Sequence, residues 1–379
     1  MKHAQDTVVL AARRLPQGRY GGSLAGLGAV RLGLNVVKEL IQDPALPQPG
    51  SLLWGMARSH TQGMNPARTL ALQAALPADT SAFTINMACG SSLQALILAS
   101  QRLNISAAPI LVGGSEAMSD TPHLVPGLRW GFRMGHRQLP DVMHQDGLRC
   151  PLTGLLMGET IEKLALKRGI TRLASDAWAA ESHRRASCAD FTAEHLIHPM
   201  LDHDEAIRPK VSAETLAKLA PVFEPLGQVT AGNASALSDG AAALLIARRD
   251  QAGDAAPLAR ILGWSEAGVD PMDMGEAPVP AVQRLLAAHG LTVADIDLWE
   301  LNEAFSAQLL VCQQRLSIPP DRLNVAGGGV ALGHPIGASG ARIVCTLIHQ
   351  LRQRGGGLGV ATLGIGGGLG LAVLIETEN

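Results

Sequence analysis

Large aromatic side chains are scarce in this 379-residue chain, which has one Tyr, five Phe and five Trp. Hydrophobic residues still make up 47% of the chain and charged residues 17%, a composition typical of globular proteins. A core with so few rings must be aliphatic and closely packed, built from Ala, Val, Leu and Gly. The length exceeds one simple core, so we expect two similar domains or one elaborated pair.

A strong charge of either sign is also missing, because 31 Lys and Arg residues balance 33 Asp and Glu residues to a net charge of −2. This balance gives no reason to expect nucleic acid or a membrane as a partner. The longest apolar run, residues 241–247, is far too short to span a bilayer. Residues 1–6 lead into a strand-like segment without a hydrophobic leader, so we expect a soluble, cytoplasmic protein.

Cysteine is infrequent, with five residues at no CxxC spacing, which argues against a disulfide framework or a structural zinc site. One of them, Cys89, stands between strand-like residues 82–85 and helical residues 93–99. The start of a helix favours a thiolate, and the N–H groups of the small residues after Cys89 can face an oxyanion. On this stretch alone, a catalytic nucleophile and a buried structural cysteine are equally open.

The rest of the chain reads as two similar α/β halves around an excursion. Strand and helix patterns alternate up to about residue 118, which predicts a layered α/β domain; its first helix is expected at 24–41. Residues 121–151 are rich in Pro, Gly, Arg and His, and we expect a folded functional excursion there, followed by helices at 157–168 and 175–189. From residue 259 the first pattern repeats. The loops after 85–86 and 323–324 would then face each other across a pseudo-twofold axis, bringing Cys89 and His334 together.

Two polar residues of the second half stand in defined turns. His334 lies between Gly333 and Pro335, which fix a turn and let a ligand approach the backbone. Taken alone, such a histidine is more often tied to a carbonyl than catalytic. Asn302 follows a strand and precedes a helix, where a capping asparagine is the ordinary alternative.

Together these blocks resemble the thiolase superfamily, whose members make and break carbon–carbon bonds through acyl thioesters. The matching blocks follow in order from the N-terminus to the last twenty residues: 13–24, 62–68, 85–96, 302–305, 333–340 and 361–370. The resemblance implies a thiolase-like α/β fold of two layered halves related by a pseudo-twofold axis. It places one half at 1–118, with 237–258 returning to it, and the other at 259–379. An inserted loop domain at 119–236 would cover coenzyme A.

The resemblance also assigns roles to individual residues. Cys89 would form the acyl-enzyme, His334 would assist its deprotonation and hydrogen-bond the thioester oxygen, and Gly366 would offer its N–H to the oxyanion. Asn302 would fix a water that completes the oxyanion site, with Glu303 orienting its neighbours. For coenzyme A, Arg208 would meet the nucleotide end, and the pantetheine channel would be lined by Met157, Phe223, Ser235 and Phe305. Taken singly, these side chains read as a solvated arginine, core residues and a capping serine.

One position departs from the family pattern. Ordinary thiolases carry a second cysteine where this chain has Gly364, and that cysteine exchanges the α-proton of the second thioester. Loss of a positioned acid/base group costs about 10²–10⁴-fold in rate, and none of Cys150, Cys188, Cys312 or Cys345 lies in a matching motif. Three alternatives could replace this acid/base group: a water held by Asn302, a loop-domain histidine such as His123 or His144, or a substrate that is already nucleophilic.

Three functions follow from the sequence. The first is a thiolase-like acyltransferase that forms a cysteine acyl-enzyme from acyl-CoA in reversible Claisen chemistry, possible in full only if a substitute base exists. The second is an acyltransferase subunit that passes the acyl group to a non-CoA acceptor in a biosynthetic complex, and the third is a non-catalytic acyl-CoA-binding relative. The resemblance further implies a coenzyme A thioester as substrate, no permanently bound cofactor or metal, and a homodimer or homotetramer.

Overall fold

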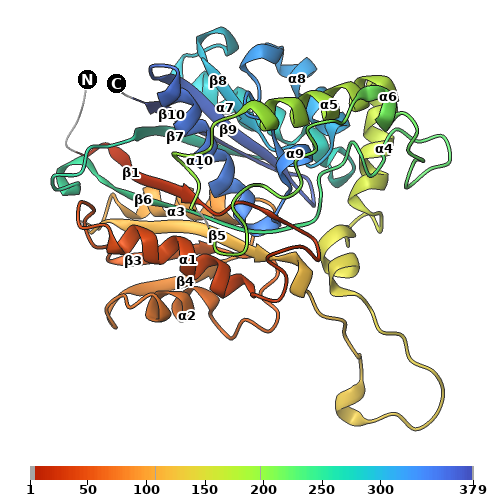
Figure 1. The fold of residues 1–379 in the computed structure, drawn as a ribbon, viewed down its shortest axis with the longest axis horizontal. Helices are drawn as coiled ribbons and strands as arrows, with labels where there is room; N and C mark the ends of the chain where they lie inside the picture. Colours follow the sequence, from red (N-terminus) through yellow and green to blue (C-terminus); the bar gives the residue numbers. More distant parts are fainter. Residues whose placement is uncertain (1–4, 107, 197, 378–379) are drawn as a thin grey trace.

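A single mixed sheet runs through the molecule, with helices on both faces (Figure 1). The computed structural model describes residues 5–106, 108–196 and 198–377; residues 1–4, which the sequence reads as the approach to the first strand, lie outside this range. The strand order is β4-β3-β5-β6-β1-β7-β10-β9-β8, and the short β2 pairs with β6. Only two residue pairs, Val8 with Arg260 and Val9 with Ala259, join β1 to β7. The sheet therefore consists of two halves that meet at this narrow junction.

The strands are β1 (Thr7–Arg14), β2 (Gly18–Arg19), β3 (Ser51–Gly55), β4 (Ser81–Ile85), β5 (Ile110–Ala117), β6 (Ser238–Arg248), β7 (Ala259–Gly268), β8 (Leu298–Leu301), β9 (Gly357–Ile365) and β10 (Leu369–Thr377). The α-helices are α1 (Ala29–Gln42), α2 (Pro66–Gln73), α3 (Ser91–Arg102), α4 (Met157–Arg168), α5 (Arg172–Cys188), α6 (Ala213–Leu216), α7 (Pro278–His289), α8 (Ser306–Leu316), α9 (Gly329–Leu332) and α10 (Ser339–Gln353).

The two half-sheets repeat one topology in mirror order. In the first, β4, β3 and β5 are parallel, and β6 and β1 follow antiparallel. In the second, β8 and β9 are parallel, and β10 and β7 follow antiparallel. A parallel bridge between Trp299 and Leu323 stands where the first half has the β3–β4 pair. The predicted α/β fold of two similar halves is therefore confirmed.

Helices α3 and α10 lie between the half-sheets. One buried cluster joins Leu96 and Ile97 of α3 to Val344 and Leu347 of α10 and to inward-facing residues of both half-sheets. Helices α1 and α2 cover the outer face of the first half, and α7 and α8 cover the outer face of the second. The core is aliphatic, as the shortage of aromatic residues predicts.

Most predicted helices lie close to their observed bounds, and α4 matches its predicted range completely. At the start of α5, the Thr171 hydroxyl accepts from the Ala174 N–H and caps the helix. The predicted start of the first helix at residue 24 is wrong, because α1 begins at Ala29. Gly26 and Gly28 have φ angles of 82° and 75°, which a helix cannot contain.

The chain leaves the sheet after β5 and returns at β6, and α4, α5 and α6 lie in this insertion. Its first part is an arm that projects from the body (Figure 1). The arm begins and ends at neighbouring positions. His123 and Asp141 form an antiparallel β-bridge through their backbones, and the Leu124 N–H donates to the Pro140 carbonyl at 2.9 Å. Among the described residues, no helix is long and apolar enough to cross a membrane.

Candidate active site

Cys89 lies on a tight turn between β4 and α3. Ala88, just before it, has a φ of 46°, a left-handed conformation that costs about 1 kcal/mol or more outside glycine. The turn is held by Ser91, whose hydroxyl donates to the Ala88 carbonyl at 2.6 Å and accepts from the Met87 N–H at 2.9 Å. A strained turn fixed by its own helix start presents Cys89 in one orientation.

The N-termini of α3 and α10 meet at this turn because small residues allow a close approach. A Cβ on Gly340 would lie 2.4 Å from the Leu93 nitrogen, so only glycine fits between the two helices. The Ser92 hydroxyl also accepts from the Ala341 N–H at 2.9 Å. The helix that follows Cys89 and the helix that follows His334 are thus joined directly.

The loop that carries His334 is fastened to the first half by Glu116, a fully buried residue near the end of β5. Its carboxylate accepts from the Gly337 N–H at 2.8 Å, the Ala57 N–H at 3.0 Å and the Arg58 N–H at 2.9 Å. Sequence reasoning did not assign Glu116 a role. A single carboxylate at the end of the apolar run 110–117 was the signal that could have found it.

The hydrogen bonds of His334 define its tautomer. Its Nδ1 lies 2.6 Å from the Ser339 oxygen, and the Ser339 hydroxyl donates its proton to the Pro335 carbonyl at 2.9 Å. Ser339 must therefore accept from Nδ1–H, which leaves the lone pair on Nε2. Nε2 is buried without a partner. Burial, and secondarily the nearby Arg342, lower the pKa of His334 to about 4, so the ring is neutral near pH 7.

A mainly apolar cavity of about 110 Å³ lies at the meeting point. Seven predicted positions line it: Cys89, Met157, Ser235, Phe305, His334, Gly364 and Gly366. Ser235 and Phe305 reach the same wall because their segments run side by side, with the Ser235 N–H donating to the Ala304 carbonyl at 3.0 Å. The structure thus brings Cys89 and His334 together in one cavity, as the pseudo-twofold argument anticipates.

The protonation of Cys89 differs from the sequence-based expectation of a favoured thiolate. Burial raises the pKa of Cys89 to about 11, against the opposing effects of the Gly366 N–H and Arg58. Desolvation outweighs the helix start here. Cys89 is therefore a neutral thiol at rest, and the His334 Nε2, which lines the same cavity, is buried without a partner.

Asn302 and Glu303 lie behind the cavity wall. Asn302 is 1% exposed, its Oδ1 accepts from the Arg342 guanidinium at 3.4 Å, and its Nδ2 has no partner. The Glu303 carboxylate accepts from two residues of α5, Trp178 Nε1 at 3.0 Å and the Ser182 hydroxyl at 2.8 Å, and from Asn324 Nδ2 and the Val330 N–H. With its oxygens engaged in this way, Glu303 holds its neighbours in place, as expected.

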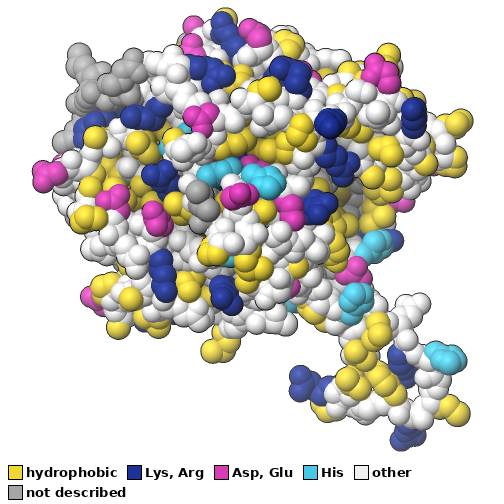
Figure 2. Space-filling view, in the orientation of Figure 1, with side chains coloured by type: hydrophobic (Ala, Val, Ile, Leu, Met, Phe, Trp, Pro, Cys, Tyr) yellow, Lys and Arg dark blue, Asp and Glu magenta, His cyan; other side chains and the backbone are white. Residues whose placement is uncertain are grey.

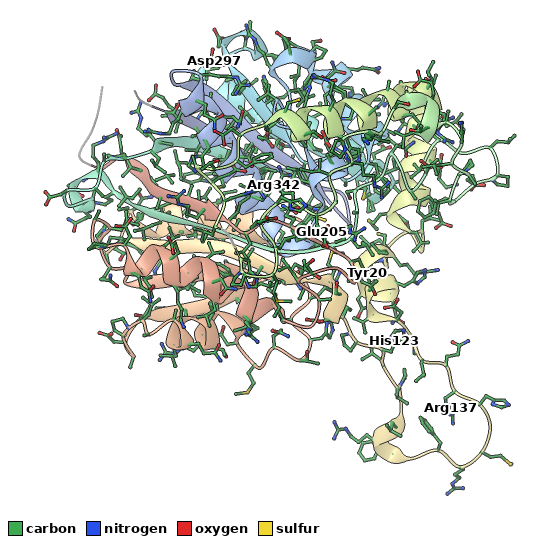
Figure 3. All side chains as sticks on the ribbon, viewed as in Figure 1. Tyr20, His123, Arg137, Glu205, Asp297 and Arg342 are labelled. Atoms are coloured by element: carbon green, nitrogen blue, oxygen red, sulfur yellow. The ribbon has the colours of Figure 1, made fainter. Side chains whose placement is uncertain are left out.

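Arg342, labelled near the centre of Figure 3, belongs to a buried polar cluster that sequence reasoning did not single out. Its guanidinium lies 3.2 Å from a Glu300 carboxylate oxygen as well as near Asn302. Burial raises the pKa of Glu300 to about 8, with Arg342 opposing the shift. The Glu-x-Asn spacing at 300–302 and an arginine inside an apolar helix were the available signals.

Other predicted binding residues do not line this cavity. Arg208 is exposed, and its backbone N–H donates to His183 Nδ1 at 3.1 Å. Phe223 packs on α4, where a Cβ on Gly158 would lie 2.0 Å from its ring, and it belongs to the same apolar cluster as Met157 and Phe305. Phe223 therefore supports the wall from behind.

The two histidines considered as substitute bases lie elsewhere. His123 is exposed at the base of the arm (Figure 3), and His144 is exposed on the insertion. Neither lines the cavity. A Cβ on Gly364 would lie 3.1 Å from the Met274 carbonyl and 3.4 Å from Pro278 Cδ, so a small side chain there needs only a shift of a few tenths of an ångström. Among the described residues, no group of three or more His, Cys, Asp or Glu side chains is placed to hold a metal ion.

Comparisons with known proteins cover the whole chain. The family models described as thiolase, N-terminal domain, and thiolase, C-terminal domain, match residues 7–250 and 255–377. An acetyl-CoA acetyltransferase of Chromobacterium violaceum is 43% identical over 98% of this chain and 99% of its own length. One of Escherichia coli strain K12 is 42% identical over 99% of this chain and all of its own length.

Solved structures agree. Human mitochondrial 3-ketoacyl-CoA thiolase in complex with CoA superposes with a TM-score of 0.95 at 37% identity and covers both chains completely. Acat5 thiolase from Ascaris suum in complex with coenzyme A gives a TM-score of 0.93 at 38% identity, over 98% of this chain and all of its own. The chain belongs to the thiolase family, and it is a thiolase-type acyltransferase that uses coenzyme A thioesters.

Proposed function

We propose that Cys89 takes the acyl group from the coenzyme A thioester, with the His334 Nε2 accepting the thiol proton. The observation that carries this assignment is that both side chains line one cavity, where Nε2 is buried without a partner. A neutral thiol and a neutral imidazole exchange one proton as the sulfur attacks the thioester carbonyl. Positioned proton transfer of this kind contributes about 10²–10⁴-fold in rate.

The oxyanion that forms on the thioester carbonyl needs donors beside the sulfur. We assign one to the Gly366 N–H, which points at Cys89. The unpartnered Nδ2 of Asn302 supports the second role, in which Asn302 holds a water that completes the oxyanion site together with His334.

We propose that residues 119–236 form a loop domain that covers the thiol arm of coenzyme A. It would lie over the two halves of the molecule, one formed by residues 1–118 and 237–258 and the other by residues 259–379. Met157, Ser235 and Phe305 line the channel next to Cys89, with Phe223 supporting it from behind. The exposed guanidinium of Arg208 lies free of the core and would meet the nucleotide phosphates outside the channel.

The acyl group that fits best is short. The cavity that Cys89 and His334 line is small, about 110 Å³. The acetyl-CoA acetyltransferases among the relatives point the same way. We therefore propose acetyl-CoA as the acyl donor.

The experiment is intact-mass measurement after incubation with acetyl-CoA. The wild-type chain should gain one acetyl group, Cys89→Ser should gain no thioester, and Cys188→Ser should react like wild type because Cys188 is exposed on α5. A chain that binds acetyl-CoA without gaining the acetyl group would be a non-catalytic relative.

Gly364 favours a second candidate, in which the acetyl group passes to an already nucleophilic acceptor within a biosynthetic complex. Without a second acid/base group, such an enzyme would acylate Cys89 but would not cleave acetoacetyl-CoA with free coenzyme A. Measured cleavage of acetoacetyl-CoA separates the two candidates.

We also propose that the chain works as a homodimer or homotetramer in the cytoplasm. Strand β4 is a sheet edge with unpaired backbone groups, and its Phe83 is 36% exposed. Figure 2 shows apolar side chains along the arm, where Trp130 is 87% and Met134 is 90% exposed. A second copy of the chain would cover these surfaces, and the nucleophile requires a reducing compartment. Light scattering in solution gives the mass of the assembly.

A further inference from the structure

A second cysteine, which belongs to the insertion, lines a cavity together with Cys89. A cavity of about 390 Å³ adjoins the first at Cys89, and its lining includes Cys150 as well as Cys89, Met157, Gly366 and Gly367. Cys150 lies in a short loop before α4, closed by the Cys150 N–H donating to the Leu155 carbonyl and the Gly154 N–H donating to the Cys150 carbonyl, each at 2.8 Å. Its position is therefore defined by backbone contacts on both sides.

Consecutive amides of one turn between β9 and β10 act on the two thiols. The Gly366 N–H favours the charged form of Cys89, and the Gly367 N–H favours the charged form of Cys150. Gly367 has a φ of 91°, a backbone conformation in which successive N–H groups can point into the same concave surface. Gly364, where relatives carry a second thiol by resemblance, lies near the end of β9, two residues before Gly366.

The surroundings of the two thiols differ. Burial opposes ionisation of Cys150, but hydrogen bonds from the Thr153 N–H and hydroxyl and from further backbone N–H groups outweigh it and lower its pKa. At Cys89 burial prevails and raises the pKa. Two thiols with oppositely shifted pKa values are suited to different steps of one reaction.

The other cysteines do not meet these conditions. The Cys312 thiol donates to the Gly275 carbonyl at 3.0 Å and is fully buried, and Cys345 lies in the core cluster of α10. Cys188 is exposed on α5. Cys150, in contrast, lines a cavity together with Cys89.

We propose that the Cys150 thiol supplies the acid/base step that Gly364 cannot perform, an inference that rests on the proposed role of Cys89. In condensation, the first coenzyme A leaves as a thiolate and takes a proton from solvent. The Cys150 thiol loses its proton to solvent, and the resulting thiolate removes an α-proton from a second acyl-CoA. The resulting enolate carbon attacks the carbonyl carbon of acyl-Cys89, the carbon–carbon bond forms, and the bond to the Cys89 sulfur breaks. Cys89 leaves as a thiolate and recovers the proton held on His334.

In cleavage, the Cys89 thiolate attacks the 3-keto carbon, and the bond to the α-carbon breaks. The departing enolate takes the proton of the Cys150 thiol. Coenzyme A then loses its thiol proton to solvent and, as a thiolate, removes the acyl group from Cys89, which recovers its proton from His334, while the Cys150 thiolate regains a proton from solvent. The residue that relatives place on β9 is thus replaced by one from the loop domain.

The test measures proton exchange separately from acylation. Wild type, Cys150→Ala, Cys150→Ser and the control Cys188→Ala are incubated with acetyl-CoA in D₂O, and deuterium in recovered acetyl-CoA is read by mass spectrometry. Acetylation of Cys89 is followed in the same samples. Both Cys150 variants should lose about 10²-fold or more in deuterium exchange and in acetoacetyl-CoA cleavage, while Cys89 acetylation changes less than about twofold. Cys188→Ala should match wild type in all three.

A compensating variant distinguishes chemistry from folding. Gly364→Cys in the Cys150→Ala background should recover exchange, because it places a thiol in the adjoining cavity that Cys89 and His334 line. Exchange that is unchanged in Cys150→Ala, absent from wild type, or lost together with Cys89 acetylation would overturn the assignment of Cys150. Failure of wild type to acetylate Cys89 would instead overturn the proposed function, which is a separate readout.

Discussion

Cys89 and His334 are both neutral at rest, since burial raises the pKa of the thiol to about 11 and lowers that of the imidazole to about 4. Alkylation of Cys89 by iodoacetamide should therefore rise about tenfold per pH unit from about pH 7 to about pH 9, as the thiolate fraction grows. Peptide mapping separates Cys89 from the exposed Cys188. A rate that is already constant across this range would show a preformed thiolate–imidazolium pair.

Ser339 acts on the reaction through His334. Because its hydroxyl fixes the Nδ1–H tautomer, Ser339→Ala should slow Cys89 acetylation about tenfold, the equivalent of one hydrogen bond of about 1.4 kcal/mol. Ser339→Thr keeps the hydroxyl and should retain most of the rate. Equal losses in both variants would indicate a packing effect rather than a hydrogen-bond effect.

At this scale the sequence identifies residues that carry a motif and misses residues that act through contacts. Cys89 and His334 are recognisable from their turns, and the structure brings them into one cavity. Glu116 stands out locally only as a lone carboxylate after an apolar run, and Cys150 carries no local signal. The relevance of both depends on partners distant in the chain: Gly337 for Glu116 and Gly367 for Cys150. Such pairings exist only after the halves and the insertion have packed.

At the scale of secondary-structure elements, the close approach of α3 to α10 determines the geometry of the site. Gly340→Ala would place a Cβ 2.4 Å from the Leu93 backbone nitrogen, so the helices must separate. We expect a loss of about 1–3 kcal/mol in the free energy of unfolding and a slower acetylation of Cys89. Urea titration and burst-phase kinetics measure the two effects.

Gly253→Ala is the matched control for this variant. Gly253 has open space around its Cβ position, although its φ of 61° adds local strain. Its substitution should lower stability without slowing acetylation. An unchanged rate of Cys89 acetylation in Gly340→Ala would contradict the claim that the contact between α3 and α10 determines the geometry of the site.

The spacing of apolar residues was sufficient to predict α4, which has a regular apolar face and ends at Gly169, a glycine in the left-handed conformation. It failed at the start of α1, because Asp120 accepts from the Gly26 and Gly28 N–H groups and holds a loop where the apolar spacing continues. That contact comes from the end of β5, so no local pattern reveals it.

At the scale of the molecule, a buried ion cluster attaches the insertion to the first half. Arg14 of β1 is fully buried and contacts Glu194 at 2.6 Å and Asp204 at 2.7 Å. Arg14→Ala leaves two buried carboxylates without it and should cost about 3–5 kcal/mol in the free energy of unfolding. Arg19→Ala, at an exposed pair with Glu205, should change it by less than about 1 kcal/mol.

The same cluster makes stability depend on acidity. Although burial works against it, Arg14 holds the pKa of Asp204 well below its ordinary value. This contribution is complete above the unfolded-state pKa of about 3.9 and is lost as the pH falls through the lower folded-state value. Wild type should therefore lose stability below about pH 4 more steeply than Arg14→Ala. Parallel curves in denaturant titrations across this range would contradict the assignment.

The repeated strand order of the molecule was predictable because each half carries its own succession of strand and helix patterns. The docking of the insertion was not, since it depends on Arg14, Glu194 and Asp204 meeting across nearly two hundred residues of chain. A charged side chain inside a strand pattern signals that a partner exists without identifying it.

The central claim is that one sulfur carries the acyl group and one imidazole activates it. The most direct measurement is peptide-level mass spectrometry of the chain quenched during turnover of acetyl-CoA, comparing wild type with His334→Asn. The account predicts an acetyl thioester on the peptide containing Cys89, formed about 10²-fold or more slowly in His334→Asn. An acetyl group on any other residue, or equal rates in the two proteins, would contradict it.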